Sequence, residues 1–206
     1  IPPRTIGHEF AGTIVATDSD QATTGDPVFV SPLLSCGQCA ACQAGSPNTC
    51  ASLGLLGIDR DGAMAEKVAV PTANLFVLPD TIDLAHAALI EPLAVAHHML
   101  GRIGATSADT VAIVGGGSIG VLLARVLDRH GVADIAVVEP DPSRAAYLDA
   151  HGFTSVHPDD AGDLAGFANV VCEATGIAAG LSSALDIAAS GGRVLLSGFG
   201  YQSDQL

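Results

Sequence analysis

The chain has 206 residues, of which 22 are Asp or Glu and 8 are Lys or Arg, so its formal charge is −14. Such acidity weighs against a nucleic-acid or anionic-membrane partner, because both need a basic surface. No apolar run approaches the roughly 20 residues that span a bilayer, and no basic-then-apolar leader is present. We therefore expect a cytoplasmic protein with no membrane partner. Because the chain begins at Ile1 without an initiator Met, and ends just after an apolar run, we expect a fragment that lacks both termini.

The first part of the chain has the composition of a small antiparallel β domain. Residues 1–80 are rich in Gly and Pro and contain short β-branched runs, which predict strands at 12–16 and 27–30. Turn signals such as Gly25-Asp26-Pro27 separate these runs. From about 91 to 105 the apolar spacing becomes helical. The apolar positions that carry this spacing are Leu93, Ala96, Leu100 and Ile103.

From residue 109 onward, short apolar runs alternate with helical patterns. This alternation predicts an α/β fold with a parallel, doubly wound sheet of the Rossmann type. The predicted strands are 110–114, 134–138, 170–172 and 193–197, and the predicted helices are 118–129, 142–151 and 178–189.

A glycine fingerprint lies where the first of these strands passes into its helix. Gly115-x-Gly117-x-x-Gly120 has the spacing and the context of a dinucleotide-binding turn. Gly115 would allow the tight turn, Gly117 the approach of a pyrophosphate, and Gly120 close helix–strand packing. The free N–H groups around Ser118 and Ile119 at the helix N-terminus would favour the anion. The alternative interpretation is a plain tight turn.

An acidic residue follows the fingerprint at the expected distance. Glu139 lies at the end of the next strand, 22 residues after Gly117. A carboxylate there accepts hydrogen bonds from the adenine ribose and repels a 2′-phosphate, which favours NAD over NADP. Arg144 lies five residues later and could offer its charge to such a phosphate, so NADP stays an alternative.

Four cysteines form the second chemical signal. Cys36, Cys39, Cys42 and Cys50 lie within 15 residues. In a cytoplasmic chain this spacing indicates a structural zinc site with four sulfur ligands. A disulfide pair and an iron–sulfur cluster are the alternatives. The fifth cysteine, Cys172, falls on a predicted buried strand, where we expect it only to pack.

A dispersed set of residues forms the third signal. Gly7-His8-Glu9 places an imidazole beside a carboxylate, and Glu91 precedes a predicted helix. Taken alone, His8 could be a hydrogen-bonded structural histidine, and Glu91 a helix N-terminal acid that the dipole favours. His97 and His98 follow on the same helix, where we expect them to pack or line a cleft.

Several motifs occur in the order found in one known family. The chain resembles the zinc-dependent medium-chain dehydrogenase/reductase (alcohol dehydrogenase) family from residue 1 to about residue 200, and within it the sorbitol and threonine dehydrogenase branch. The motifs are Ile6-Gly7-His8-Glu9-Phe10-Ala11-Gly12, Gly25-Asp26-Pro27-Val28, the four cysteines, Asp61-Gly62-Ala63-Met64-Ala65-Glu66, Glu91-Pro92-Leu93-Ala94-Val95-Ala96-His97, the glycine fingerprint and Cys172-Glu173-Ala174-Thr175-Gly176.

The resemblance implies two domains and a second metal site. Residues 1–92 would form a GroES-like catalytic domain and residues 93–206 an NAD-binding Rossmann domain, both incomplete. His8, Glu9 and Glu91 would be the catalytic residues and would hold a catalytic zinc. A mixed nitrogen and oxygen site with an open position lowers the pKa of an alcohol, which allows hydride transfer to nicotinamide.

The resemblance also implies which residues face the nicotinamide. These are Thr175, Gly176, Ser197, Gly198 and Phe199, at strand ends where open α/β sheets bind ligands. The expected substrate is a secondary alcohol or polyol, and the expected assembly of the full-length protein is a homodimer or homotetramer.

Family members carry a further zinc-ligating cysteine, and a hydroxyl residue soon after it, upstream of the Gly-His-Glu motif. The chain begins after that point, so a non-catalytic NAD-binding or assembly module is the alternative function. A zinc-free relative of the quinone oxidoreductases would leave the four cysteines and the His8-Glu9 pair unexplained.

Overall fold

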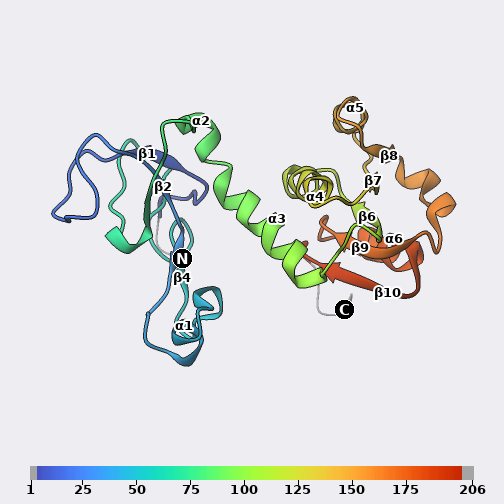
Figure 1. The fold of residues 1–206 in the computed structure, drawn as a ribbon, viewed down its shortest axis with the longest axis horizontal. Helices are drawn as coiled ribbons and strands as arrows, with labels where there is room; N and C mark the ends of the chain where they lie inside the picture. Colours follow the sequence, from blue (N-terminus) through green and yellow to red (C-terminus); the bar gives the residue numbers. More distant parts are fainter. Residues whose placement is uncertain (1–3, 201–206) are drawn as a thin grey trace. The chain divides into compact units, whose positions relative to one another are not determined.

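The computed structural model describes residues 4–200 and divides the chain into two compact units, Ile1–Glu91 and Pro92–Leu206. The strands of each unit pair only within that unit (Figure 1). Each unit also has its own apolar core. The fold class expected from the sequence is confirmed: an antiparallel β unit precedes a parallel α/β unit.

The first unit is built on an antiparallel sheet with the strand order β1-β2-β5, and β3 pairs with β4 separately. The strands of this unit are β1 (Ala11–Thr13), β2 (Pro27–Val30), β3 (Leu33–Leu34), β4 (Gly54–Leu55) and β5 (Leu75–Val77). Its helical segments are α1 (Ala40–Gln43), η1 (Pro47–Thr49), η2 (Thr72–Asn74) and α2 (Leu84–Ala87).

Two apolar clusters stabilise the first unit on the two faces of β2. Val28 and Val30 pack in one cluster with Leu56, while Phe29 packs in the other with Leu78. This is the period-2 alternation of a strand that is covered on both faces. Asn74 is buried among these elements, and its amide donates hydrogen bonds to the carbonyls of residues 31 and 33 at 2.6 and 2.8 Å.

The second unit contains a five-stranded parallel sheet with the order β10-β9-β6-β7-β8. Its strands are β6 (Thr110–Val114), β7 (Asp134–Val138), β8 (Thr154–Val156), β9 (Ala168–Glu173) and β10 (Ala188–Leu196). Its helices are α4 (Ser118–Arg129), α5 (Pro142–Ala150), η3 (Pro158–Leu164) and α6 (Ala178–Ile187), while α3 (Ile90–Ile103) begins in the first unit and continues into this one.

Helices cover both faces of this sheet. Val111 and Ile113 of β6 pack in one cluster with side chains of α3 and α4, whereas Ala112 and Val114 pack in another with α6. The chain order reverses between β6 and β9, and such a switch point is where doubly wound sheets bind ligands at the carboxyl ends of their strands.

Most predicted elements agree with the structure to within a few residues. The strands at 27–30, 110–114 and 134–138 match β2, β6 and β7. In the second unit, the strand β8 and the helical segment η3, which precedes β9, were not predicted. Leu93, expected on the apolar face of α3, is 40 % exposed, while Met99 is buried instead. Among the described residues, no helix is long and apolar enough to cross a membrane.

Arg193, within β10, ties this strand to the end of α3. Its guanidinium donates hydrogen bonds to the carbonyls of Ile103 and Gly104 at 2.7 and 2.8 Å, and to Asp109 at 2.8 Å. Two of these acceptors are helix C-terminal carbonyls, where a cation is favourable. Asp109 also accepts from the backbone N–H and the hydroxyl of Thr106 at 2.7 and 2.9 Å.

These contacts make Asp109 a source of pH-dependent stability. Hydrogen bonds from the Thr106 N–H, and then from the Thr106 hydroxyl and Arg193, hold the pKa of Asp109 below its ordinary value against the opposing effect of burial. A depressed carboxyl pKa contributes stability above the unfolded value of about 3.9, and that contribution is lost as the pH falls through the folded value.

We therefore expect Asp109→Asn to unfold at a lower urea concentration than the unsubstituted chain at pH 7, with the difference shrinking as the pH falls below about 4. The control is Asp128→Asn, which alters an exposed carboxylate on α4. A difference for Asp109→Asn that is constant from pH 7 to pH 3 would contradict the assignment.

Candidate metal and cofactor sites

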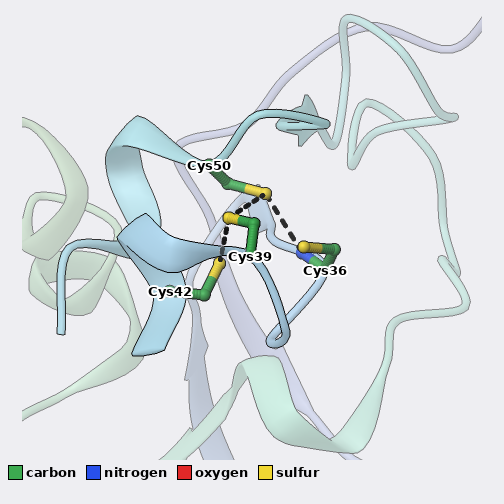
Figure 2. A group of neighbouring side chains, drawn as sticks. All are labelled: Cys36, Cys39, Cys42 and Cys50. Atoms are coloured by element: carbon green, nitrogen blue, oxygen red, sulfur yellow. Dashed lines mark hydrogen bonds between the residues drawn. The ribbon is translucent and has the colours of Figure 1, made fainter. Parts of the chain in front are cut away.

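The four cysteines predicted as a structural zinc site lie together in the first unit. Their sulfur atoms are all within 4.8 Å of one another, and they come from the segment that contains α1 and η1. Figure 2 shows the four side chains directed toward a common centre. The sulfur of Cys39 is 3.5 Å from that of Cys42 and 3.9 Å from that of Cys50.

These distances fit a metal better than a disulfide. None of the four cysteines is bonded to another, and a disulfide would need a sulfur separation of about 2.05 Å. A tetrahedral zinc with Zn–S bonds of about 2.3 Å holds its sulfurs about 3.8 Å apart. The spacing and the donor chemistry therefore suit zinc.

Backbone N–H groups favour the ionised form of two of the four thiols, Cys39 and Cys36. The N–H groups of Cys42 and Ala51 are the main hydrogen-bond donors that lower the pKa of Cys39 to about 6. Backbone hydrogen bonds from Gln38 and Cys39 likewise lower the pKa of Cys36. Burial and the neighbouring sulfurs raise the pKa of Cys42 to about 11, as expected where four thiols share one small volume. A bound cation would reverse that last effect.

A second group of possible ligands joins His8, Glu9 and Glu91. One imidazole nitrogen and one oxygen of each carboxylate lie within 4.8 Å of one another. All three residues belong to the first unit, although Glu91 is about 80 residues away in the chain. One nitrogen and two oxygen donors are a ligand set that zinc accepts. The structure thus brings together the three residues that the family resemblance implied.

Close backbone packing holds the segment that carries His8. Gly7 has a φ of 98°, which other residues rarely adopt. The backbone of Gly7 lies very near Gly57, so that a Cβ added to Gly57 would be 2.5 Å from the carbonyl oxygen of Gly7. A Cβ added to Gly62 would overlap the same oxygen. Backbone hydrogen bonds of 2.8–3.0 Å from residues 62–64 to residues 5–7 add to this support.

Glu91 occupies the first turn of α3, where the helix N-terminus favours a carboxylate. Burial raises its pKa, His8 lowers it and the nearby Glu9 raises it again. Two acids and one histidine close together therefore leave an excess of negative charge, which a divalent cation would neutralise. His97 and His98 lie farther along α3, are exposed, and do not belong to either group of ligands among residues 4–200.

The glycine fingerprint forms the turn between β6 and α4, as predicted. Gly115 has a φ of 107°, and a Cβ on Gly120 would overlap the carbonyl oxygen of Gly115. No heavy atom lies within 4 Å of where a Cβ on Gly117 would be, so that position is open. Ser118, Ile119 and Gly120 form the first turn of α4, where backbone N–H groups lack partners within the helix.

Glu139 lies beside this turn at the end of β7. Its side chain is 3 % exposed and accepts hydrogen bonds from the N–H groups of Gly116 and Asp141, both at 2.8 Å. Arg144 approaches one carboxylate oxygen at 3.6 Å, but its own side chain is 58 % exposed. Each oxygen of Glu139 is thus held by one N–H group and can still accept from a ligand hydroxyl.

The segments after β9 and β10 lie against each other. A Cβ on Gly198 would overlap the backbone of Gly176, and Gly176 itself has a φ of 72°. Ser197 donates from its N–H and its hydroxyl to the carbonyl of Glu173, both at 2.9 Å. Thr175, two residues after the end of β9, is exposed.

Two buried residues of β9 have different roles. Cys172 is fully buried in the core, and burial raises its pKa to about 12, so it packs as expected. The Glu173 carboxylate is also fully buried, and sequence analysis assigned it no role. The available signal was an acidic residue directly after the apolar run Val170–Cys172.

Comparisons with known proteins agree with this architecture. Residues 1–80 match the alcohol dehydrogenase GroES-like domain, and residues 111–166 match the TrkA-N domain. The 2-dehydro-3-deoxy-L-galactonate 5-dehydrogenase of Pseudoalteromonas atlantica is 37 % identical over 205 residues, which cover 94 % of this chain. The chain spans about 60 % of the length of that curated relative.

Two solved structures share the fold. A protein described as a zinc-binding dehydrogenase from Sinorhizobium meliloti, bound to NADP, is 33 % identical with a TM-score of 0.91. An alcohol dehydrogenase from Escherichia coli CFT073, complexed with NADH, is 30 % identical with a TM-score of 0.88. Each alignment covers 98 % of this chain and 63 % of the other.

A GroES-like β unit joined to a dinucleotide-type α/β unit defines the class of two-domain dehydrogenases. Within that class, the chain belongs to the zinc-dependent medium-chain dehydrogenase family.

Two of the three fingerprint glycines, Gly117 and Gly120, should respond differently to substitution by alanine. We expect Gly120→Ala to lower the free energy of unfolding by about 2 kcal/mol or more, because the new methyl group overlaps the Gly115 carbonyl. Gly117→Ala should cost less than about 1 kcal/mol, because the position is open and begins the helix. Urea unfolding measures both, and equal losses would contradict the packing described.

Proposed function

We propose that the protein carrying this chain is a zinc- and NAD-dependent dehydrogenase that oxidises a secondary alcohol or polyol. The observation that carries the proposal is the meeting of His8, Glu9 and Glu91, whose donor atoms lie within 4.8 Å of one another. This ligand set occurs in a chain whose second unit has a dinucleotide fingerprint and whose curated relatives are named as dehydrogenases.

The residues present fit two zinc ions of different roles. Cys36, Cys39, Cys42 and Cys50 would fill all four positions of a tetrahedral ion, which leaves it purely structural. Within this chain, His8, Glu9 and Glu91 supply at most three ligands, fewer than the four positions of a tetrahedral ion, as in catalytic zinc sites that keep a position for water or substrate. When bound, zinc would supply a Lewis acid for an alcohol oxygen, and NAD would supply the hydride acceptor.

The chain's own groups prepare the open site. His8 would bind through an imidazole nitrogen and Glu91 through its half-buried carboxylate. Glu9 is exposed and could bind directly or through a water molecule. The close contact of Gly7 with Gly57 and Gly62 would hold the backbone from which His8 and Glu9 extend.

We further propose that NAD is the cofactor rather than NADP. Gly115, Gly117, Ser118, Ile119 and Gly120 would hold the pyrophosphate, because the open Gly117 and the first turn of α4 present backbone N–H groups. The buried carboxylate of Glu139 would accept from the ribose hydroxyls and repel a 2′-phosphate. Arg144 is the group that could accommodate such a phosphate, since most of its side chain is exposed.

The remaining elements of the proposal concern the environment of the protein. Thiols used as metal ligands rather than disulfides favour the cytoplasm. A homodimer or homotetramer is proposed for the full-length protein, since closed symmetric assemblies are common among soluble enzymes. No observation in the structure or the comparisons supports the alternative of a non-catalytic module.

Metal analysis tests the two zinc sites separately. We expect about two zinc ions per chain, about one after Cys39→Ser, and about one after His8→Ala. Cys172→Ala, which alters the buried cysteine outside both groups, should retain two. Zinc in the cysteine site alone would remove the catalytic-metal part of the proposal.

Cofactor titration tests the role of Glu139. We expect the unsubstituted chain to bind NADH more tightly than NADPH. In Glu139→Gln the ratio of the NADPH dissociation constant to the NADH dissociation constant should fall about tenfold, because the charge that repels the 2′-phosphate is lost. Arg144→Gln should instead raise this ratio, because a positive charge that could bind the 2′-phosphate is lost. An unchanged ratio of the two dissociation constants in Glu139→Gln would assign cofactor choice elsewhere.

An activity assay tests the reaction itself. With the zinc-loaded protein, NAD and a panel of secondary alcohols, polyols and sugar acids, we expect NADH to form with at least one substrate and not with His8→Ala. A zinc-loaded protein that binds NADH yet oxidises no member of the panel would exclude the proposed substrate class.

A further inference from the structure

Glu173 is a buried acidic residue at the carboxyl end of β9, next to the switch point of the sheet. Its side chain is 0 % exposed, and it follows three buried apolar residues of the same strand. Burial of a carboxylate costs several kcal/mol unless its oxygens are hydrogen-bonded. The hydrogen-bond donors to Glu173 therefore indicate which segments this residue holds in place.

The Glu173 side chain accepts hydrogen bonds from the turn that follows β9. One carboxylate oxygen accepts from the N–H of Thr175 at 2.6 Å and from the Thr175 hydroxyl. The N–H of Gly176 is 3.1 Å from this oxygen and 3.3 Å from the other. The hydroxyl oxygen of Thr175 also accepts a hydrogen bond from the N–H of Ile177 at 3.3 Å. Rotating this hydroxyl away from Glu173 would therefore break two hydrogen bonds.

The main chain of Glu173 organises the segment after β10 in the same way. Its carbonyl accepts from the N–H and the hydroxyl of Ser197, both at 2.9 Å, and from the N–H of Gly198 at 3.2 Å. A Cβ on Gly198 would lie 2.6 Å from a carboxylate oxygen of Glu173. One residue thus contacts both strand-end segments.

The fingerprint turn packs against the same group. A Cβ on Gly115 would be 2.8 Å from the Thr175 methyl carbon, so only glycine allows this approach. A Cβ on Gly180 of α6 would be 2.8 Å from a carboxylate oxygen of Glu173. The carboxylate is therefore enclosed on the helix side as well, and the Thr175 turn has little freedom to move.

We propose that Glu173 is a positioning residue that fixes the Thr175–Gly176 and Ser197–Gly198 segments for the nicotinamide half of the dinucleotide. The inference rests on the proposed NAD-binding function. The adenine half would depend on other groups, namely the start of α4 and Glu139. Loss of the Glu173 carboxylate should therefore weaken binding of the intact dinucleotide more than binding of a ligand without nicotinamide.

The test compares NADH with ADP-ribose, which has the same adenine half but no nicotinamide. In Glu173→Gln an amide NH2 replaces one of the acceptor oxygens that face the N–H groups of Thr175 and Gly176. We expect the dissociation constant for NADH to rise about tenfold and that for ADP-ribose less than about twofold, as measured by titration calorimetry. A merely structural role would weaken both ligands equally.

A second pair of variants covers the case in which Glu173→Gln does not fold. Thr175 is exposed, so its substitution should leave the core intact. Thr175→Val removes the hydroxyl that donates to Glu173, and Thr175→Ser keeps it. We expect Thr175→Val to raise the NADH dissociation constant selectively, and Thr175→Ser to resemble the unsubstituted chain.

The outcomes separate the inference from the function on which it rests. If the unsubstituted chain binds neither NADH nor ADP-ribose, the proposed cofactor site is wrong, and this inference with it. If it binds both, and the folded variants lose neither ligand or lose both equally, the positioning role of Glu173 alone is overturned.

Discussion

Close contact between glycine and neighbouring backbone is the physical constraint on which the dinucleotide turn and the site of His8, Glu9 and Glu91 depend. At the fingerprint, α4 can start directly against the end of β6 only because Gly120 lacks a side chain that would overlap the Gly115 carbonyl. In the first unit, Gly57 and Gly62 press in the same way on Gly7, next to His8. Glycine makes these approaches possible at an entropic cost that the surrounding hydrogen bonds offset.

Charge on this protein is arranged in a way that matches its proposed ligands. The chain carries −14 formal charges, yet a dinucleotide phosphate would meet backbone N–H groups at a helix end rather than lysines. The clustered acids Glu9 and Glu91 favour a cation at the other site. Most of the other acids are exposed, where salt screens their mutual repulsion, whereas Glu139 and Glu173 are buried and hydrogen-bonded.

Much of the second unit could be predicted from sequence, because its strands are short apolar runs followed by recognisable helix starts. β6, β7 and the Gly115–Gly120 turn are examples. β8 was missed because Thr154–Val156 contains only three residues, two of them hydroxyl-bearing, and is specified by pairing with β7 rather than by pattern. The exposure of Leu93 was not predicted, because helical periodicity alone does not decide which of two adjacent apolar faces of a helix packs against the rest of the protein.

The candidate sites divide in the same way. The four cysteines are close in the chain, so spacing alone indicated that they could share a metal. The meeting of His8 with Glu91 is a long-range contact that only a family resemblance could imply. The role of Glu173 was beyond sequence analysis, since nothing in a pattern shows which backbone N–H groups a buried carboxylate will meet. Relatives with bound NADP and with bound NADH show why cofactor choice must be argued from Glu139 and Arg144.

X-ray absorption at the zinc edge tests the central claim most directly, because it reports ligand type without requiring a substrate. In a protein made of residues 1–206, one site with four sulfur ligands and one with only nitrogen and oxygen ligands predict an average of about two sulfurs per zinc. In His8→Ala the average should rise to about four sulfurs, since only the cysteine site would remain. An average of four sulfurs in the unsubstituted protein would contradict zinc binding by His8, Glu9 and Glu91.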